Sequence, residues 1–529
     1  MDKIYLLIRG SKGKSPHERT NEMTSKKPFT VRLKQDFVKQ KLVAIESDLA
    51  ESKLGLSEQD LRTLEDQVSV IFHVAASVKF EAPLEINMRH NVVATKELLE
   101  LACNFKKLLC FVHVSTAYSN CQLRQIDERI YPMKVPEDPM GVQVTKAMIE
   151  NRPNTYTYTK AMAENVASKY AARLNIVIVR PSIVMSSLKE PAEGWVDTIN
   201  GPVGLSVLGA LGILQKIKVN SEVVFDLIPV DIVTNALVSI AWAATEKRDE
   251  FLPGSPPSLA GVETNNNSIN NNNIIRANGH ECGVDTSVGP IEASSHVPAD
   301  GSICCVASKE IKTRPLDGAV RVFNLTTGAE NPCSFYHYFS VGREEAYKKP
   351  STRALRPLLT IPKQKGMNPI QYWIHKIFSH LLFAYIVDTL LSLFGQKKMV
   401  IKAVKRMHHA NDMFDYFCSN QWTFVTDNVK RLRELQTPLD RKTFNCDVRA
   451  IEWRSYAQVG WLGCRRFILN EDDASFNYAK RRYRIVCLLY YVMKFVLLLS
   501  LTSLAMYCIG SPLVRAMLLT PFYGIIYLL

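Results

Sequence analysis

The first half of the chain contains five short runs of apolar residues, and helix-like stretches separate them. The runs cover residues 4–8, 42–45, 68–74, 109–114 and 175–180. Near-continuous apolar strands that alternate with helices are typical of a parallel sheet covered by helices on both faces. The pattern therefore predicts a doubly wound α/β fold.

Residues 254–315 interrupt this pattern. Seven of the nine residues from 265 to 273 are Asn, and apolar residues lack periodicity as far as residue 300. A segment of this composition buries too little apolar surface to fold, so we expect a disordered Asn-rich insertion. The sequence thus predicts an α/β domain formed by residues 1–253 and 316–360, and an α-rich domain at residues 370–470.

The C-terminal tail, residues 485–529, has the composition of a membrane anchor. Residues 485–509 contain one charged residue, Lys494, and at about 1.5 Å per residue they reach across a bilayer core of about 30 Å. A second apolar stretch, residues 513–529, carries Arg515. The basic cluster at residues 480–484 is expected on the cytosolic side, with the bulk of the protein. A buried amphipathic helical hairpin is the alternative, which Lys494 makes credible.

Charge and cysteine content exclude several classes of protein. Lys and Arg outnumber Asp and Glu by 65 to 51, but no stretch interleaves them with aromatic residues, so we expect no nucleic-acid partner. The twelve cysteines include no C-x-x-C pair, and the histidines form no H-E-x-x-H motif. The chain therefore fits a reducing compartment, and no metal site is expected.

A Tyr-x-x-x-Lys motif is the main candidate for chemistry. Tyr156 and Lys160 are four residues apart in a predicted helix, so they share one face of it. An ammonium next to a phenol favours the phenolate, which lets the tyrosine exchange a proton near neutral pH. The competing pair, Tyr158 and Met162, has no cation.

Two hydroxyl residues follow the apolar run at 109–114. Ser115 and Thr116 stand where open α/β sheets place ligand-binding loops, and either hydroxyl could bind a substrate carbonyl oxygen. They could also simply cap the following turn. The chain order favours the first interpretation, because the Ser-Thr pair, the Tyr-x-x-x-Lys motif and a strand ending in Arg-Pro follow one another.

These segments give the chain a resemblance to the extended short-chain dehydrogenase/reductases, and within them to the alcohol-forming fatty acyl-CoA reductases, especially those of insects. The resemblance covers most of the chain outside residues 254–315. The segments that carry it are residues 5–9, 74–80, 113–118, 156–160, 179–182, 190–197, 200–202 and 226–231, and in the α-rich part His380, Asp388, Phe417, Trp422 and residues 444–449.

The resemblance implies a reaction and a role for each candidate residue. Long-chain acyl-CoA would be reduced to an aldehyde and then to a primary alcohol, in two hydride transfers. Tyr156 would donate the proton, and Lys160 would bind the nicotinamide ribose and lower the pKa of Tyr156. Ser115 or Thr116 would hold the carbonyl oxygen.

The resemblance also implies a cofactor and a location. Arg9, at the end of its strand, is placed to meet a 2′-phosphate, which favours NADPH over NADH. Asp48 and Ala75 would line the adenine and ribose side, and Pro181 would also contact the cofactor. The expected location is an intracellular membrane, the endoplasmic reticulum or the peroxisome, with the catalytic domain facing the cytosol.

One part of the family pattern is not found. The family begins with a strand and a G-x-x-G-x-x-G turn whose backbone N–H groups hold the pyrophosphate. Here residues 4–8 correspond to the second strand, so the predicted Rossmann-like sheet lacks its first strand, and its second and fourth strands lose their common neighbour. We hypothesise that this chain is an N-terminally truncated reductase.

Two other functions stay open. One is a different membrane-bound reductase of the same superfamily, such as a hydroxysteroid dehydrogenase, although the α-rich domain with Trp422 and Asp447 argues against it. The other is a catalytically dead, membrane-bound binding protein, which the missing glycine-rich turn makes plausible.

Overall fold

The computed structural model describes residues 2–11, 13–32, 35–80, 82–136, 149, 152–217, 219–246, 320–361, 369–398 and 400–508. The predicted insertion at 254–315 and the end of the tail, residues 509–529, lie outside these ranges. Met1–Phe251 and Leu316–Leu529 belong to one compact unit. The predicted division between an α/β domain and an α-rich domain near residues 360–370 stays a prediction.

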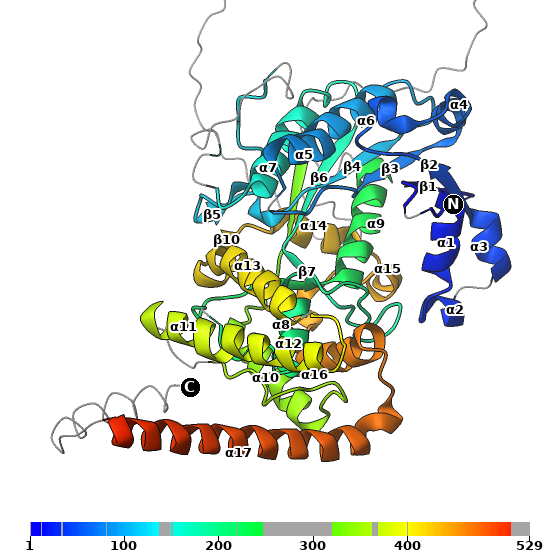
Figure 1. Cartoon of the computed structure of the whole chain (residues 1–529). Coiled ribbons are helices and arrows are strands. Elements are labelled where there is room, and N and C mark those ends of the chain that lie inside the picture. The colour runs from blue at the N-terminus through cyan, green and yellow to red at the C-terminus, as the bar shows by residue number, and fades with distance from the viewer. Residues whose placement is uncertain are drawn as a thin grey trace, which may run out of the picture. The chain divides into compact units, whose positions relative to one another are not determined.

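The strands of the first half agree with the apolar runs (Figure 1). The strands are β1 (Ile4–Ile8), β2 (Leu42–Glu46), β3 (Val70–His73), β4 (Cys110–Val114), β5 (Gln125–Ile126), β6 (Ile176–Pro181), β7 (Ile183–Met185), β8 (Leu227–Pro229), β9 (Arg321–Leu325) and β10 (Thr423–Phe424). The α-helices are α1 (Pro16–Thr24), α2 (Phe29–Arg32), α3 (Gln35–Lys41), α4 (Glu58–Gln67), α5 (Leu84–Met88), α6 (Ala94–Ala102), α7 (Thr155–Ser168), α8 (Gly201–Ala210), α9 (Val230–Glu246), α10 (Phe335–Lys348), α11 (Pro369–His375), α12 (Phe383–Leu393), α13 (Val400–Ser419), α14 (Asp427–Leu435), α15 (Pro438–Thr443), α16 (Trp453–Gly463) and α17 (Phe476–Cys508).

The central sheet is parallel and has the order β3-β4-β6-β9. Its two faces bury alternate residues of the same strands, as the side-chain period of two requires. Phe111 and Ile178 pack under α6 and α7, whereas Val112 and Val179 pack on the other face with residues of α9. Helices on both faces confirm the predicted doubly wound fold.

A second, separate sheet consists of β1 and β2, which are also parallel. Among the described strands, neither β1 nor β3 pairs along its other edge. Leu7 of β1 and Phe72 of β3 are both 38% exposed. This exposure is unusual for apolar strand residues of a doubly wound fold, which helices bury on both faces.

The C-terminal half is helical, as expected, and the two-residue pair β5–β10 joins it to the first half. Two helices among the described residues are long and apolar enough to cross a membrane, Ile370–Leu393 and Asp473–Ser500. The first runs through α11, the π-helical segment η6 (Lys376–Leu382) and α12. The second belongs to α17, whose side chains from Ile485 to Ser500 are mostly exposed, which does not fit the buried-hairpin alternative.

Candidate active site

Helix α7 carries the Tyr-x-x-x-Lys motif, and its start is fixed by a cap. The Asn154 side chain accepts a hydrogen bond of 2.9 Å from the backbone N–H of Thr157. Asn is among the best capping residues because its oxygen satisfies a free helical N–H. Tyr156 therefore lies in the first turn and Lys160 one turn later, both inside the helix as predicted.

Lys160 is buried, and its ammonium donates a hydrogen bond of 2.7 Å to the carbonyl of Val114, the last residue of β4. Burial lowers the pKa of Lys160 to about 8, and the carboxylate of Glu164 opposes part of this shift. An ammonium has three N–H donors, so two are left for another acceptor.

Tyr156 is half-buried, and its ring lies 5.4 Å from that of Phe80. Phe80 in turn contacts Phe414 and Phe417 of α13, so the helical C-terminal half provides one wall beside the phenol. Burial raises the pKa of Tyr156 to about 12, opposite to the predicted direction. The reason is that Lys160 directs its ammonium to Val114, so loss of water contact dominates. The phenol consequently stays protonated at neutral pH.

The alternative pair is part of the core. Tyr158 and Met162 are both buried in the apolar cluster beneath α6 and α7. Tyr156 thus remains the candidate proton donor of this helix.

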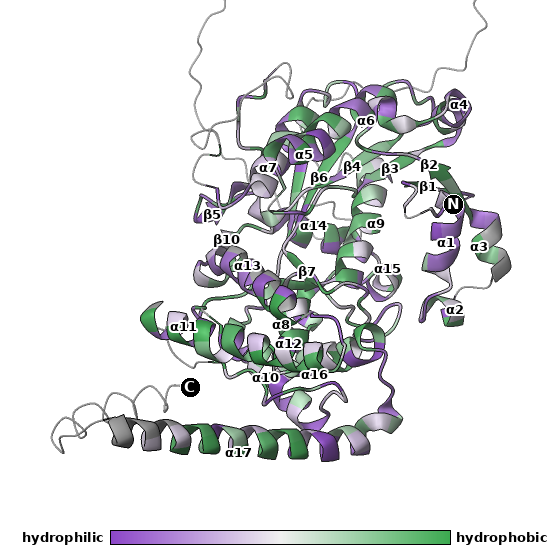
Figure 2. Ribbon diagram, in the orientation of Figure 1, coloured by the Kyte–Doolittle hydropathy of each residue, from purple (hydrophilic) through white to green (hydrophobic). Residues whose placement is uncertain are grey.

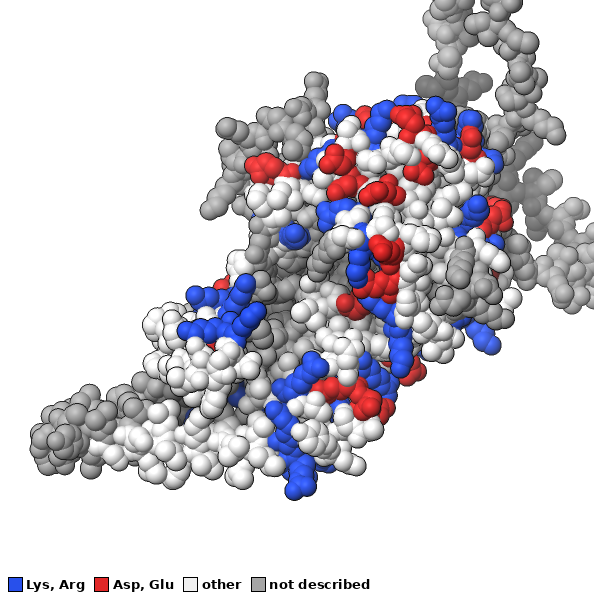
Figure 3. Space-filling view, turned by 45° about the vertical axis from the view of Figure 1, so that its right-hand side comes forward, with Lys and Arg blue, Asp and Glu red and all other residues white. Residues whose placement is uncertain are grey.

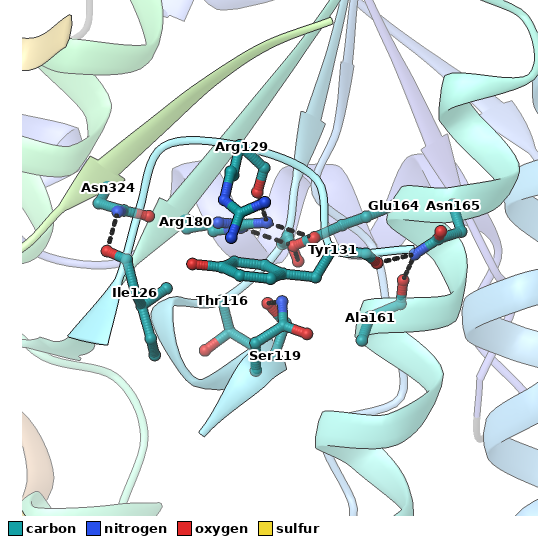
Figure 4. A network of polar contacts seen from close by, with 12 residues as sticks. Thr116, Ser119, Ile126, Arg129, Tyr131, Ala161, Glu164, Asn165, Arg180 and Asn324 are labelled. Atoms are coloured by element: carbon teal, nitrogen blue, oxygen red, sulfur yellow. Dashed lines mark hydrogen bonds and ion pairs between the residues drawn. The ribbon is translucent and has the colours of Figure 1, made fainter. Parts of the chain in front are cut away.

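Ser115 is committed to a buried ion pair. Its hydroxyl donates a hydrogen bond of 2.5 Å to Glu164, and Arg180 donates to the same carboxylate at 2.6 and 2.9 Å. Figure 4 shows the Arg180 guanidinium facing Glu164 next to the ring of Tyr131. Arg180 and Glu164 are almost completely buried, so the carboxylate depends on these donors.

Thr116 has a different environment. Its side-chain oxygen accepts a weak hydrogen bond of 3.3 Å from the backbone N–H of Tyr118, as the cap of the short helix at residues 117–120. Accepting leaves the O–H proton of Thr116 free to donate elsewhere. Both readings of this residue, as a cap and as a donor to substrate, are therefore compatible.

The predicted cofactor residues fall into two groups. Arg9 and Asp48 come together because β1 and β2 are parallel and end side by side, with the guanidinium 3.9 Å from the carboxylate. Ala75 is exposed in the loop after β3, and Pro181 is the buried last residue of β6. Asn91 ties the loop after β3 to α7 through hydrogen bonds to Ser77 and Thr159.

Two of these residues could bind a dinucleotide at its two ribose ends. The ammonium of Lys160 keeps two N–H donors next to the end of β4, and the Arg9 side chain is 60% exposed at the end of β1. Across the described residues, no glycine-rich turn between a strand and a helix matches the pyrophosphate motif of the family.

The sequence analysis did not predict that four further residues take part in the site: Phe80, Asn91, Glu164 and Arg180. Glu164 had a detectable signal, because it lies four residues after Lys160 on the same face of α7. Arg180 was noted only as part of a motif. Nothing in the one-dimensional pattern indicated that Phe80 and Asn91 meet α7, since both contacts join segments about 70 residues apart.

Known protein families and solved structures match large parts of the chain. Two family models, both described as male sterility protein, match the chain: an NAD-binding model over residues 1–237 and the Sterile model over residues 379–471. Among solved structures, the terminal R domain of the myxalamid biosynthetic pathway is 16% identical, with a TM-score of 0.50 over 88% of this chain and 84% of its own. This likeness supports the parallel-sheet, Rossmann-like fold.

Curated relatives match over most of the chain. Fatty acyl-CoA reductase 1 of Xenopus laevis is 33% identical over 498 residues, which are 90% of this chain and 81% of the relative. The Homo sapiens fatty acyl-CoA reductase 1 is 32% identical, over 91% and 82%, and fatty acyl-CoA reductase 2 is 30% identical, over 94% and 85%. The chain therefore belongs to the fatty acyl-CoA reductase family.

Proposed function

We propose that this protein reduces long-chain fatty acyl-CoA to a primary fatty alcohol through an aldehyde, with NADPH as the hydride donor. The observation that carries the proposal is the position of Tyr156 and Lys160, one turn apart on α7 and next to the end of β4. The names of the relatives add the substrate class.

The proposed chemistry uses the phenol as an acid. When bound, the reduced nicotinamide supplies a hydride to the carbonyl carbon of the substrate. Thr116 donates a hydrogen bond to the carbonyl oxygen, where negative charge develops. In the first reduction the C–S bond breaks, and the CoA thiolate leaves and takes up a proton. In the second, Tyr156 gives its proton to the oxygen of the aldehyde, and a pKa of about 12 keeps that proton available.

Lys160 and Arg9 would select and orient the cofactor. The two free N–H donors of Lys160 suit the hydroxyls of the nicotinamide ribose. Arg9 would bind a 2′-phosphate, because a guanidinium forms strong, charge-assisted hydrogen bonds to phosphate oxygens. Asp48, 3.9 Å from Arg9, would then keep the guanidinium oriented, with Ala75 and Pro181 in contact with the cofactor.

The proposed location is an intracellular membrane, the endoplasmic reticulum or the peroxisome, with the site on the cytosolic side. The apolar part of α17 would anchor the chain. Exposed Lys480, Arg481 and Arg484 precede that part and fit the charge bias of cytosolic flanks.

The test is product analysis of the full chain in membranes. With palmitoyl-CoA and NADPH we expect hexadecanol, and no alcohol from the Tyr156→Phe variant. A chimera in which the N-terminal segment of a curated relative precedes this chain is assayed in parallel. Failure of the chimera to bind NADPH would favour a binding protein without activity, and a steroid product would favour the other reductase class.

A further inference from the structure

The helix formed by α11, η6 and α12 has an outer face without charge. Nine large apolar side chains are exposed along it: Ile370, Trp373, Phe378, Leu382, Tyr385, Ile386, Leu390, Leu393 and Phe394. The other exposed positions between residues 370 and 394 are Thr389 and Ser392. Hydrophobic residues recur along the ribbons of α11 and α12 (Figure 2). An exposed apolar patch of this extent marks a surface that something else covers.

The inner face of the same helix carries polar residues that form hydrogen bonds with the rest of the protein. Nε2 of His380 accepts a hydrogen bond of 3.0 Å from the backbone N–H of Gln215. The buried carboxylate of Asp388 accepts hydrogen bonds of 2.9 and 3.0 Å from Val400 and Ile401, the first residues of α13. A helix that crossed the bilayer would lose these partners and bring a carboxylate into lipid, which is strongly unfavourable.

A single short segment, residues 354–358, holds both this helix and α17. Arg356 is buried, donates a hydrogen bond of 2.6 Å to the carbonyl of Ser379 and lies over the ring of Phe383. On α17, Arg482 donates to the carbonyl of Ala354, and the hydroxyl of Tyr483 accepts from the N–H of Leu358. Residues 354–358 thus contact both apolar helices.

Basic residues border both helices. Lys397, Lys398, Lys402 and Lys405 are exposed after the end of α12, and Lys480, Arg481 and Arg484 are exposed on α17 before its apolar part. Figure 3 shows basic side chains gathered in groups beside uncharged surface. Lysines next to an apolar helix face suit the headgroups of an anionic bilayer.

We infer that the outer face of α11–η6–α12 lies in the plane of the bilayer interface, as a second membrane contact beside α17. The inference rests on the proposed membrane association. It replaces a membrane crossing, which the length and composition of this helix alone would allow, by a contact in the plane of the interface. Its occupant is the anionic phospholipid surface, because cations border the apolar face and residues 354–358, which hold this helix, also hold the proposed anchor α17.

Photolabelling of the full chain by a phospholipid tests whether residues 370–394 contact the bilayer. The protein is reconstituted into vesicles of phosphatidylcholine and phosphatidylserine that contain a phospholipid with a diazirine in its acyl chain. After irradiation, mass spectrometry should find lipid adducts in residues 370–394 as well as in α17, and none in the polar helix α14. Adducts in α17 alone would overturn the inference and leave the anchor intact, whereas adducts in neither would remove both.

Substitutions on the outer face test whether its apolar side chains make the contact. Ile386→Glu combined with Leu390→Glu should reduce adducts in residues 370–394 severalfold, with labelling of α17 unchanged. Leu439→Glu, at a leucine of α15 that is even more exposed than Ile386 and Leu390, is the control and should change neither. Lys397→Gln with Lys398→Gln should weaken the preference for phosphatidylserine. In a parallel experiment with a bifunctional protein cross-linker, cross-links that join two copies through residues 370–394, together with no lipid adducts there, would assign the face to a second copy and refute the inference.

Discussion

Replacing each of the two hydroxyl residues after β4 should have opposite consequences, because the structure gives them different partners. Thr116→Val removes a hydroxyl whose proton is free, and its only structural loss is a cap hydrogen bond of 3.3 Å. Such caps contribute about 0.5–2 kcal/mol, and this long one belongs at the lower end. Loss of one donor to a developing oxyanion lowers kcat by about 10²–10³-fold.

Ser115→Ala removes a hydrogen bond of 2.5 Å to a buried carboxylate. Hydrogen bonds to charged groups contribute about 1.5–3 kcal/mol, and Glu164 keeps only Arg180 as a partner once the serine hydroxyl is gone. The free energy of unfolding should fall by about that amount, while kcat stays within about threefold, a barrier change under 1 kcal/mol.

The assay measures kcat with palmitoyl-CoA and, separately, with hexadecanal, so that only the carbonyl step is compared. Thermal unfolding in the same detergent gives the stability of each variant. Thr24→Val, which removes a buried threonine hydroxyl in α1, is the matched control and should leave kcat unchanged. A large loss of kcat in a folded Ser115→Ala protein, with Thr116→Val active, would refute the assignment.

Three further outcomes are expected. Tyr156→Phe should lower the rate of hexadecanal reduction by about 10²–10⁴-fold with unfolding unchanged, and a smaller loss in a folded variant would exclude it as the acid. Because the pKa of Lys160 is lowered to about 8, the unfolded chain binds more protons between about pH 8 and pH 10.5. The free energy of unfolding should therefore gain a contribution from Lys160 as pH rises through this window, the KM for NADPH should rise above pH 8, and Lys160→Arg should lack both effects. Gly463→Ala should destabilise by about 1–3 kcal/mol in thermal or urea unfolding. Its Cβ would lie 1.8 Å from the carbonyl oxygen of Gly194, whereas Gly342→Ala on α10, with 3.8 Å to the nearest atom, should be tolerated.

The α/β part of the fold was predictable because local pattern and burial agree there. The runs that form β4 and β6 are continuous and apolar, and these strands are buried on both faces. The runs for β3 and β4 extended a little too far, because the hydrogen-bonded ladder begins at Val70 and Cys110. Hydropathy alone does not show where pairing stops.

The site was predictable only as far as one helix determines it. The spacing of Tyr156 and Lys160 places them on one face, but the pKa of Tyr156 depends on where the ammonium points and on Phe80, both set by tertiary contacts. The choice between Ser115 and Thr116 was likewise undecidable, because Glu164, which takes the serine hydroxyl, is 49 residues away.

The membrane surface illustrates the same limit in another way. Residues 370–394 resemble an ordinary amphipathic helix of an α-rich domain, since Asp388 and His380 interrupt the apolar run. Only the structure shows that these two residues face the body, which leaves the remaining face uninterrupted. The signal in the sequence is the spacing: His380 and Asp388 are eight residues apart, and with Ala384 between them they form a buried row on one face of the helix.

A second membrane contact, held by the same residues 354–358 as the proposed anchor, would restrict how the protein is oriented at the bilayer. With a single anchor the rest of the protein can turn about its linker, whereas two membrane contacts held by Arg356, Arg482 and Tyr483 would leave it one orientation relative to the bilayer. A long acyl chain partitions into the bilayer, with its CoA headgroup in water. A fixed orientation would present the site to that substrate in the same way at each encounter. Loss of the second contact should therefore raise the KM for palmitoyl-CoA in vesicles more than the KM for a short, soluble acyl-CoA.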